Sequence, residues 1–302
     1  MTSKFSKRPA MSNTMGRSLL MPSGPWSHRT VNAAGVNFHV AIHGPEDGTP
    51  VLLLHSFPRT WLSWKHTLVS LGDANWRAIA MDLRGFGNSD LQPHGQDPLR
   101  MSADISAVIS ALGYTNAHVI GAGLGGILGW ILAATTPKRV RSLMSVCSPH
   151  PLCATTLNHP PAVMKLLALT RAPYLNRALL KSGRLIDMGA QTLCAPGSHF
   201  PLDPYRYAFS RPFAAETALE ATIRAHALTH KTRSRIDTTI DRPVSTVMAR
   251  EDPLHTRAAY LRDQQWVQDP IQTFEVPGGH YATEEAPVEV TKAVFKHLEP
   301  YA

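Results

Sequence analysis

One five-residue segment, Gly121–Gly125, carries the strongest chemical pattern in this sequence, because it has the form of a turn that presents a nucleophile. It follows an apolar run over residues 117–120 and leads into an apolar, helix-like run over residues 126–132. A strand, a sharp turn and a helix in this order form the nucleophile elbow, G-x-nucleophile-x-G. The central residue should be Ser, Asp or Cys, yet here it is Gly123. The sequence therefore predicts the turn of a covalent catalyst without its reacting atom.

Four other segments each follow a predicted strand and could bring functional groups to the same place. They are His55–Trp64, Asp82–Asp90, Ala249–Pro253 and Pro277–Pro287. In an open α/β sheet the parallel strands end at one edge, and ligands bind outside that edge. We therefore expect these segments to lie around the elbow.

With these five segments in this order, the chain resembles the α/β-hydrolase fold superfamily, and within it the branch of epoxide hydrolases and haloalkane or haloacetate dehalogenases. The likeness runs from about Trp26 to the C-terminus. Its most specific parts are His55–Trp64, which is close to H-G-F-P-x-x-W-x-S-W, and Asp82–Asp90, which reads D-L-R-G-F-G-N-S-D. The resemblance implies an α/β fold with a mostly parallel eight-stranded sheet flanked by helices and a helical lid insertion.

The resemblance also assigns the catalytic positions. The superfamily orders its triad as nucleophile, acid and base, and these positions are Gly123, Asp252 and His280 here. The separation of Asp252 and His280 suits one intervening helix and strand. We expect Asp252 to orient the imidazole of His280 and to stabilise its charged form. Covalent hydrolysis is not expected, because position 123 has no nucleophile.

Two backbone N–H groups, those of Phe57 and Leu124, are implied as the oxyanion hole. They do not depend on the side chain that position 123 has lost. The family element often contains a cis proline, which makes Pro58 the candidate here. Ser56 stands where that element has glycine, so it adds a side chain beside the hole.

Glycine at the centre of the elbow has a simple physical interpretation. A residue with a Cβ is strained in this turn by about 1–3 kcal/mol, whereas glycine adopts such a conformation without that cost. Relative to G-H-D-W-G-G of the branch, the segment from Gly121 to Gly126 differs at its second, third and fourth positions. It also fits the dinucleotide pattern G-x-G-x-x-G, but only superficially in this context.

The lid is the second place where the sequence departs from the branch. Lid tyrosines of the branch donate a proton or hydrogen bond to the epoxide oxygen, one of them in a Y-R-A helix. The matching segment has Ile223 at the tyrosine position, with Tyr174, Tyr205 and Tyr207 as substitutes elsewhere in the lid. The residues that we expect to line the pocket are His55, Pro58, Tyr205 and Tyr207.

Three side chains outside the elbow could replace the missing nucleophile. Ser56, Cys147 and Ser148 lie on predicted loops near the same edge of the sheet. None of them lies on the elbow, where the helix dipole and the oxyanion hole converge on the attacking atom. A relocated nucleophile is therefore the less favoured alternative.

The elements that must position these residues can be read from the apolar pattern. Short β-branched runs alternate with helical patterns, which indicates a mostly parallel sheet covered by helices. A helix face over residues 105–112 ends at Gly113, and residues 288–298 form a final helix. Residues 43–48 predict a hairpin link between the first two expected strands. The expected strands are residues 36–42, 51–54, 77–81, 117–120, 143–146, 244–248 and 271–276.

The chain divides into a tail, a core and an insertion. Residues 1–24 predict a disordered N-terminal extension, since they are polar and lack the apolar run of a secretory signal. Residues 25–148 and 242–302 predict the two parts of the hydrolase core. Residues 149–241 break the alternation of strands and helices and predict a helical cap over the sheet.

Composition limits the class of protein. The 302 residues are 43% hydrophobic and 17% charged, and no apolar run reaches the roughly 18–20 residues of a membrane span. Three cysteines without a CxxC pair indicate a cytoplasmic protein with no disulfide framework and no metal site. The net charge of +8 comes partly from the tail and accompanies no nucleic-acid motif. We expect a small apolar substrate or ligand, no cofactor, no nucleic acid and no membrane, with a homodimer as the assembly to test.

Two functions compete on these residues. In the first, His280 oriented by Asp252 acts as a general base on water or on an acidic substrate proton, and the oxyanion hole stabilises the developing charge. In the second, the protein is an inactive pseudo-hydrolase that binds a small apolar ligand or a protein partner through its lid pocket. Binding of nucleic acid or an acidic surface by the basic tail and the Arg-rich lid is a third, weaker alternative.

Overall fold

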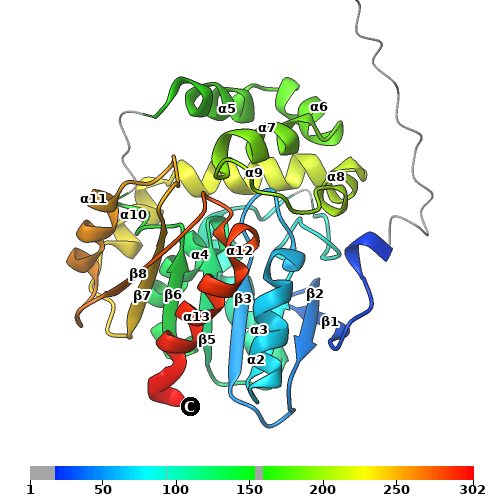
Figure 1. Ribbon diagram of the computed structural model, residues 1–302. Coiled ribbons are helices and arrows are strands. Elements are labelled where there is room, and N and C mark those ends of the chain that lie inside the picture. Colours follow the sequence, from blue (N-terminus) through cyan, green and yellow to red (C-terminus); the bar gives the residue numbers. More distant parts are fainter. Residues whose placement is uncertain (1–17, 93, 154–158) are drawn as a thin grey trace, which may run out of the picture.

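The computed structural model describes residues 18–92, 94–153 and 159–302, and in this part of the chain an eight-stranded sheet lies between two layers of helices (Figure 1). The strand order is β1-β2-β4-β3-β5-β6-β7-β8. β2 runs antiparallel to both of its neighbours, and all other adjacent strands are parallel. The strands are β1 Ser27–Ala33, β2 Val36–His43, β3 Pro50–Leu54, β4 Arg77–Met81, β5 Ala117–Ala122, β6 Val140–Val146, β7 Val244–Ala249 and β8 Gln272–Val276.

The mostly parallel sheet confirms the predicted fold class, while one strand was missed and one local interpretation was wrong. β1 was not predicted, because this edge strand is largely exposed and has little apolar periodicity. The hairpin predicted at residues 43–48 does not join neighbouring strands, since β4 lies between β2 and β3. The buried apolar β3 pairs in parallel with β4 on one side and β5 on the other, which leaves β2 only the outer side of β4.

Helices cover both faces of the sheet because its central strands are apolar on both faces. Leu52 and Leu54 of β3 belong to the core on the side of α3 and α4, and Val51 and Leu53 belong to the core on the side of α2 and α13. The core elements are η1 Trp61–Trp64, α2 Lys65–Asp73, α3 Pro98–Ala111, α4 Leu124–Thr135, η2 Pro137–Arg139, α11 Arg257–Arg262, η3 Asp263–Trp266, α12 Ala282–Glu285, α13 Pro287–Leu298 and η4 Glu299–Tyr301.

The region between β6 and β7 is helical in the residues described. Figure 1 shows α5 to α9 stacked above the edge at which the parallel strands end, and we call these five the cap helices. α9 and α10 both pack against α4, so this region rests directly on the core. The helices are α5 Pro161–Arg171, α6 Leu175–Lys181, α7 Arg184–Leu193, α8 Asp203–Ser210, α9 Ala214–His226 and α10 His230–Ile236.

The predicted disordered extension of residues 1–24 falls mainly on residues 1–17, which lie outside the described residues. For residues 18–24 the prediction needs correction. Leu20 is buried in the core, and its carbonyl oxygen accepts a hydrogen bond from Trp61 Nε1 at 2.9 Å. Leu19, Leu20 and Met21 form a run of only three apolar residues beside a polar tail, which is too short to predict a folded element. None of the helices in the described chain has the length and apolar character that a membrane crossing requires.

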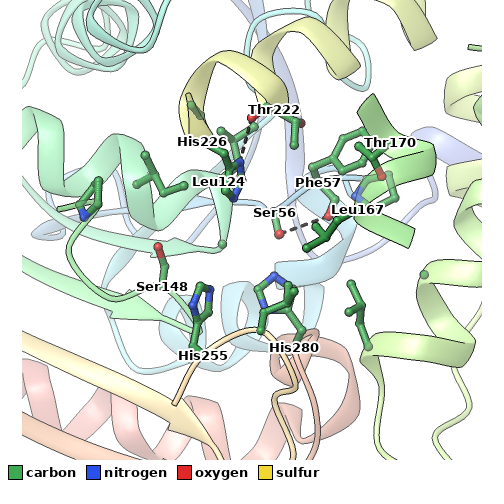
Figure 2. A pocket seen from close by; sticks show the side chains of 18 of the residues that line it. Ser56, Phe57, Leu124, Ser148, Leu167, Thr170, Thr222, His226, His255 and His280 are labelled. Atoms are coloured by element: carbon green, nitrogen blue, oxygen red, sulfur yellow. Dashed lines mark hydrogen bonds between the residues drawn. The ribbon is translucent and has the colours of Figure 1, made fainter. Parts of the chain in front are cut away.

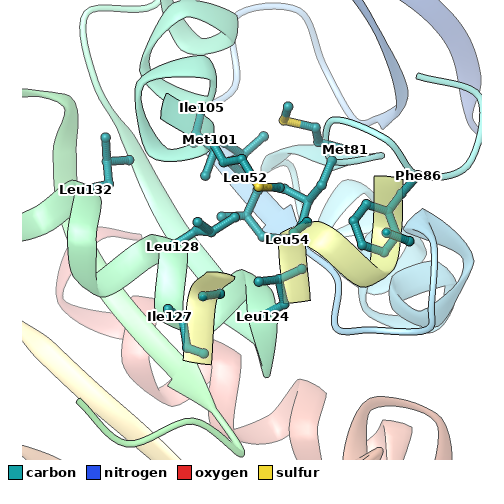
Figure 3. Packing of buried hydrophobic residues seen from close by; sticks show 14 of the residues in the cluster. Leu52, Leu54, Met81, Phe86, Met101, Ile105, Leu124, Ile127, Leu128 and Leu132 are labelled. Atoms are coloured by element: carbon teal, nitrogen blue, oxygen red, sulfur yellow. The ribbon is translucent and has the colours of Figure 1, made fainter. Parts of the chain in front are cut away.

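A tightly packed apolar layer supports the turn between β5 and α4. Figure 3 shows Leu124 and Leu128 of α4 directed toward Leu52 and Leu54 of β3, with Met101 of α3 beside them. All five side chains are almost completely buried. Interiors packed at this density resist displacement, so the start of α4 is held rigidly against the end of β3.

Candidate functional site

The predicted elbow is present as a sharp turn between β5 and α4. Gly123 has φ 48° and ψ −112°, a conformation that residues with a Cβ rarely adopt. Its N–H donates to the carbonyl oxygen of Val146 at 3.0 Å, and its own carbonyl accepts from Ile127 at 3.0 Å. The backbone of a nucleophile elbow is therefore kept, although the side chain is missing.

The two flanking glycines, Gly121 and Gly125, allow close approach of three backbone segments. A Cβ on Gly121 would collide with the carbonyl group of Gly125, and a Cβ on Gly125 would collide with the carbonyl group of Leu54. The N–H of Gly125 also donates to the carbonyl oxygen of His55 at 3.1 Å. These glycines lock the elbow against the loop that follows β3.

Asp252 and His280 lie together at the same edge of the sheet. The Nδ1–H of His280 donates to Asp252 Oδ2 over 3.1 Å, and both side chains are buried. Burial alone would raise the pKa of the Asp252 carboxyl, but the neighbouring His280 holds it below its ordinary value. With Nδ1 committed to the carboxylate, a neutral His280 has its lone pair on Nε2, the nitrogen that a general base uses.

Hydrogen bonds to residues of both the core and the cap hold the loop that carries His280 in place. The carboxylate of Glu285 accepts hydrogen bonds from the N–H groups of Gly279 and Tyr281, each at 3.0 Å, and from that of Ala195 in the cap at 2.7 Å. The N–H of His280 itself donates to the carbonyl oxygen of Leu193, the last residue of α7, at 2.8 Å. The position of the imidazole therefore depends on a docked cap.

A cavity of about 280 Å³ separates the elbow from the cap helices. Its walls are mainly apolar, and Figure 2 shows His280, His255, Ser56 and Leu124 around the same space with His226 opposite. This volume lies near the lower end of the roughly 300–1,000 Å³ typical of ligand sites. The cavity suits a small apolar molecule.

The two residues expected to supply the oxyanion donors both line this cavity. Phe57 and Leu124 line it, and neither of their N–H groups donates to any of the described residues. Leu124 is the first residue of α4, where a helix leaves its N–H groups without internal acceptors and carries partial positive charge. The Phe57–Pro58 peptide bond is cis, as predicted.

Ser56 occupies the space that a nucleophile side chain would need. An ideal Cβ built on Gly123 would overlap the Ser56 hydroxyl, would lie 2.9 Å from Ser56 Cβ, and would lie 3.4 Å from His280 Nε2. The hydroxyl donates weakly to the carbonyl oxygen of Phe57 over 3.3 Å. A side chain at position 123 and the serine at position 56 thus compete for one place beside the imidazole.

Two other histidines face the cavity, and the sequence analysis missed both. His226, at the end of α9, donates from Nδ1 to the carbonyl oxygen of Thr222 at 2.8 Å, so Nε2 of the neutral imidazole is an acceptor. The ring of His255 lies 5.7 Å from that of His280, and burial lowers its pKa to about 4. The available signal was helical spacing: Thr222 and His226 share a face of α9 that excludes Ile223.

Of the four residues expected to line the pocket, Pro58 lines the cavity. His55 is fully buried outside it, where Nδ1–H donates to the carbonyl oxygen of Ser56 at 2.8 Å and Nε2 accepts from Leu83 N–H at 3.1 Å. Tyr205 and Tyr207 do not line the cavity either. His55 holds the loop after β3 in place, which is a structural role.

Tyr205 belongs instead to a buried cluster around Arg59. The guanidinium of Arg59 lies 4.8 Å from the ring centre of Tyr205 and 3.7 Å from that of Tyr281, and it forms an ion pair with Glu284. The hydroxyl of Tyr205 donates to the same Glu284 carboxylate at 2.6 Å. Because Tyr205 lies on α8 and the others on the core, this cluster joins the cap to the core.

Of the three alternative nucleophiles, Ser56 and Ser148 line the cavity and Cys147 does not. Burial raises the pKa of the Cys147 thiol well above its ordinary value, so it stays protonated and unreactive. Tyr174 is exposed on the cap and also lies outside the cavity. None of the Asp82–Asp90 segment lines the cavity. The Asp82 carboxylate accepts from Asn88 N–H in its own loop and from Trp61 N–H at the start of η1, at 2.9 Å each, and so joins these two segments.

One group of side chains in the described residues could bind a metal ion. Asp252, His255 and His280 each offer a ligand atom, and these atoms lie within 4.8 Å of one another. A cation there would have to displace the hydrogen bond between His280 and Asp252. The arrangement of these three side chains therefore favours the hydrogen-bonded pair of His280 and Asp252 over a bound metal ion.

Comparison with known proteins agrees with this fold. A family described as the alpha/beta hydrolase fold matches residues 49–287. The AB hydrolase superfamily protein YfhM of Bacillus subtilis is 29% identical over 89% of this chain and 96% of its own length. Epoxide hydrolase 4 of Mus musculus is 35% identical, but the match covers 43% of this chain and only 37% of the mouse protein.

Solved structures resemble the chain over nearly its whole length. Cfl2 from Burkholderia cenocepacia superposes with a TM-score of 0.80 at 21% identity, covering 90% of this chain and 95% of that one. Epoxide hydrolase VrEH1 from Vigna radiata superposes with a TM-score of 0.74 at 23% identity, covering 92% and 99%. At such identities the superpositions establish the fold alone.

Proposed function

This chain belongs to the alpha/beta hydrolase fold family and resembles its epoxide hydrolases, and from that premise we propose that it acts on a small apolar molecule in the cavity beneath the cap helices. The observation that carries the proposal is the buried hydrogen bond of 3.1 Å between His280 Nδ1 and Asp252 Oδ2 at the wall of that cavity. A buried pair kept in this form is more than an apolar ligand pocket requires.

His280 acts in this proposal as the general base. Asp252 fixes the imidazole and stabilises the positive charge that forms when Nε2 takes a proton from water or from an acidic substrate group. The N–H groups of Phe57 and Leu124 then stabilise negative charge on a substrate oxygen. No ester can form on residue 123, because glycine has no side chain.

A turnover panel of epoxides, haloacids and carboxylic esters tests the proposal. We expect His280→Ala and Asp252→Asn to lower turnover of the accepted substrate about 10²–10⁴-fold, the usual contribution of a positioned base. His230→Ala is the matched control, because His230 is an exposed histidine outside the cavity. Turnover that survives in His280→Ala would contradict the proposal.

Ligand binding without turnover is the second candidate, favoured by the missing side chain at Gly123. Calorimetric titration with the panel separates the two: binding of a compound that neither the wild type nor any variant converts supports the pseudo-hydrolase. A cytoplasmic location and a homodimer are also proposals, the first supported by three cysteines that form no disulfide among the described residues.

A further inference from the structure

We propose that Ser56 is a relocated nucleophile and that the protein is a serine esterase for small carboxylic esters with apolar acyl groups. This inference rests on the proposed role of His280 as general base and goes beyond it, because it adds a covalent intermediate. It concerns a hydroxyl on the loop after β3, whereas the elbow of the fold supplies only backbone.

The first argument is the position of the Ser56 hydroxyl. The place of a Cβ on Gly123 overlaps the Ser56 hydroxyl and lies 3.4 Å from His280 Nε2. Ser56 Oγ and His280 Nε2 thus both lie within 3.4 Å of one point, the point from which an elbow side chain would reach the imidazole. In Figure 2 the Ser56 hydroxyl lies in the space between Leu124 and His280.

The second argument is that moving the hydroxyl from position 123 to position 56 leaves the oxyanion hole unchanged. One donor is the N–H of the residue after the elbow centre, Leu124, and the other is that of the residue after Ser56, Phe57. Neither N–H donates to a described residue, and both residues line the cavity. A nucleophile at either position is therefore followed directly in the chain by one of the two donor residues, and the other donor residue lines the same cavity.

The third argument is the state of the hydroxyl itself. Ser56 is only 6% exposed, so few water molecules compete for it, and its present hydrogen bond to the Phe57 carbonyl is long at 3.3 Å. No hydrogen bond joins it to His280, so the hydroxyl must turn toward Nε2 when substrate binds. Catalytic hydrogen bonds are often loose before substrate binds and tighten in the complex.

The chemistry balances as an acyl transfer. Ser56 Oγ bonds to the ester carbonyl carbon while its proton passes to His280 Nε2, and the carbonyl oxygen takes negative charge facing the N–H groups of Phe57 and Leu124. When the carbonyl re-forms, the bond to the alcohol oxygen breaks, and the imidazolium gives that oxygen its proton. Water then loses a proton to His280, its oxygen adds to the acyl carbon, the bond to Ser56 Oγ breaks, and Ser56 regains the proton.

The cavity fits this substrate class. Its volume of about 280 Å³ accommodates a small acyl group, and cap residues such as Leu166, Leu185 and Leu193 give it apolar walls. Burying each additional CH₂ of the acyl chain should raise kcat/KM about fourfold. Reactivity should therefore rise from acetate to butyrate and fall when the acyl chain exceeds the cavity.

The experiment uses the full chain with p-nitrophenyl butyrate and, separately, phenylmethanesulfonyl fluoride. We expect a burst of about one p-nitrophenolate per chain, a sulfonyl adduct that peptide mass spectrometry locates on Ser56, and loss of both in Ser56→Ala. Ser148→Ala, which changes the other cavity serine of the described residues, should retain the adduct on Ser56. Thermal unfolding of each variant checks that the proteins are folded. If Ser56 had only a structural role, no sulfonyl adduct would form on its hydroxyl.

Each outcome separates the two proposals. Turnover that depends on His280 but persists in Ser56→Ala without an adduct overturns the nucleophile and leaves the general base intact. An adduct on Ser148, or no adduct and no burst in the wild type, also overturns the nucleophile. Turnover and adduct that persist in His280→Ala contradict the proposed function itself.

Discussion

Replacing Gly123 by alanine probes the competition between positions 56 and 123 without any assumption about activity. The new Cβ meets two separate costs. One is the backbone conformation at φ 48°, and the other is overlap with the Ser56 side chain, whose Cβ would be 2.9 Å away. Because Ser56 is buried, its side chain has little room to move aside.

The expected magnitude follows from these two costs. A residue with a Cβ in such a backbone conformation is destabilised by about 1–3 kcal/mol, and overpacking of a rigid interior adds about 1–3 kcal/mol. We therefore expect Gly123→Ala to lower the free energy of unfolding by about 2–6 kcal/mol. Gly113→Ala is the matched control, since Gly113 also has positive φ (90°) but a Cβ there would meet nothing within 4 Å. It should show the backbone cost alone.

Urea denaturation of the wild type, Gly123→Ala, Ser56→Gly and the double variant forms a double-mutant cycle. Removing the Ser56 side chain should relieve the overlap. The free energy of unfolding of the double variant should therefore exceed the value expected from adding the two single effects by about 1–3 kcal/mol. A coupling free energy within about 0.5 kcal/mol of zero is the additive result expected of independent sites. That result would refute the claim that the two positions compete for one space.

Three further predictions follow from the same structure. Gly123→Asp alone should give no epoxide or haloacid turnover, because Ser56 blocks the new side chain. The double variant Ser56→Gly/Gly123→Asp should give measurable turnover in the same panel. Equal inactivity of both proteins would count against the claim that Ser56 blocks position 123. Acidification should destabilise the fold, because burial lowers the pKa of His118 and His150 to about 3 and that of His255 and His297 to about 4, so that the unfolded chain binds more protons than the folded one below about pH 6.5. The contribution of these histidines to the free energy of unfolding should be fully present above that pH. It should fall by up to about 1.4 kcal/mol per pH unit and per histidine as the pH drops toward 4. A free energy of unfolding that stays constant between pH 7 and pH 5 would contradict the assignment. Glu284→Gln should lower the free energy of unfolding by about 3–5 kcal/mol, since it leaves the buried Arg59 without its counter-charge. The control Glu289→Gln, at an exposed position on α13, should change it by less than about 0.5 kcal/mol in the same urea titration.

The sequence was sufficient to predict which loops follow the parallel strands, because apolar runs form the strands and turn residues come directly after them. The pairing of Asp252 with His280 came from the family resemblance that these loops carry. The elbow conformation also followed from sequence, because Gly123 lies between two glycines whose close packing the motif already implies.

The remaining parts of the site depend on contacts between segments far apart in the chain. Nothing local indicates that the Ser56 hydroxyl fills the place of a side chain at position 123, since the two belong to different strands' loops. His226 was missed because the family's tyrosine position corresponds to Ile223, which lies on another face of α9. Tyr205 was assigned to the pocket because its partners, Arg59 and Glu284, are distant in sequence.

The cluster around Arg59 also bears on how this protein could acquire new specificity. Insertions between two core strands invite the idea of modular exchange, in which one cap is replaced by another as a cassette. Here the guanidinium takes aromatic neighbours from the cap, Phe200 and Tyr205, and its counter-charge from the core. A grafted cap without those two rings would leave the buried guanidinium with only one of its three aromatic neighbours, Tyr281 of the core. Diversification of this lineage should therefore proceed by point substitutions inside the existing cap rather than by transplantation of a foreign one.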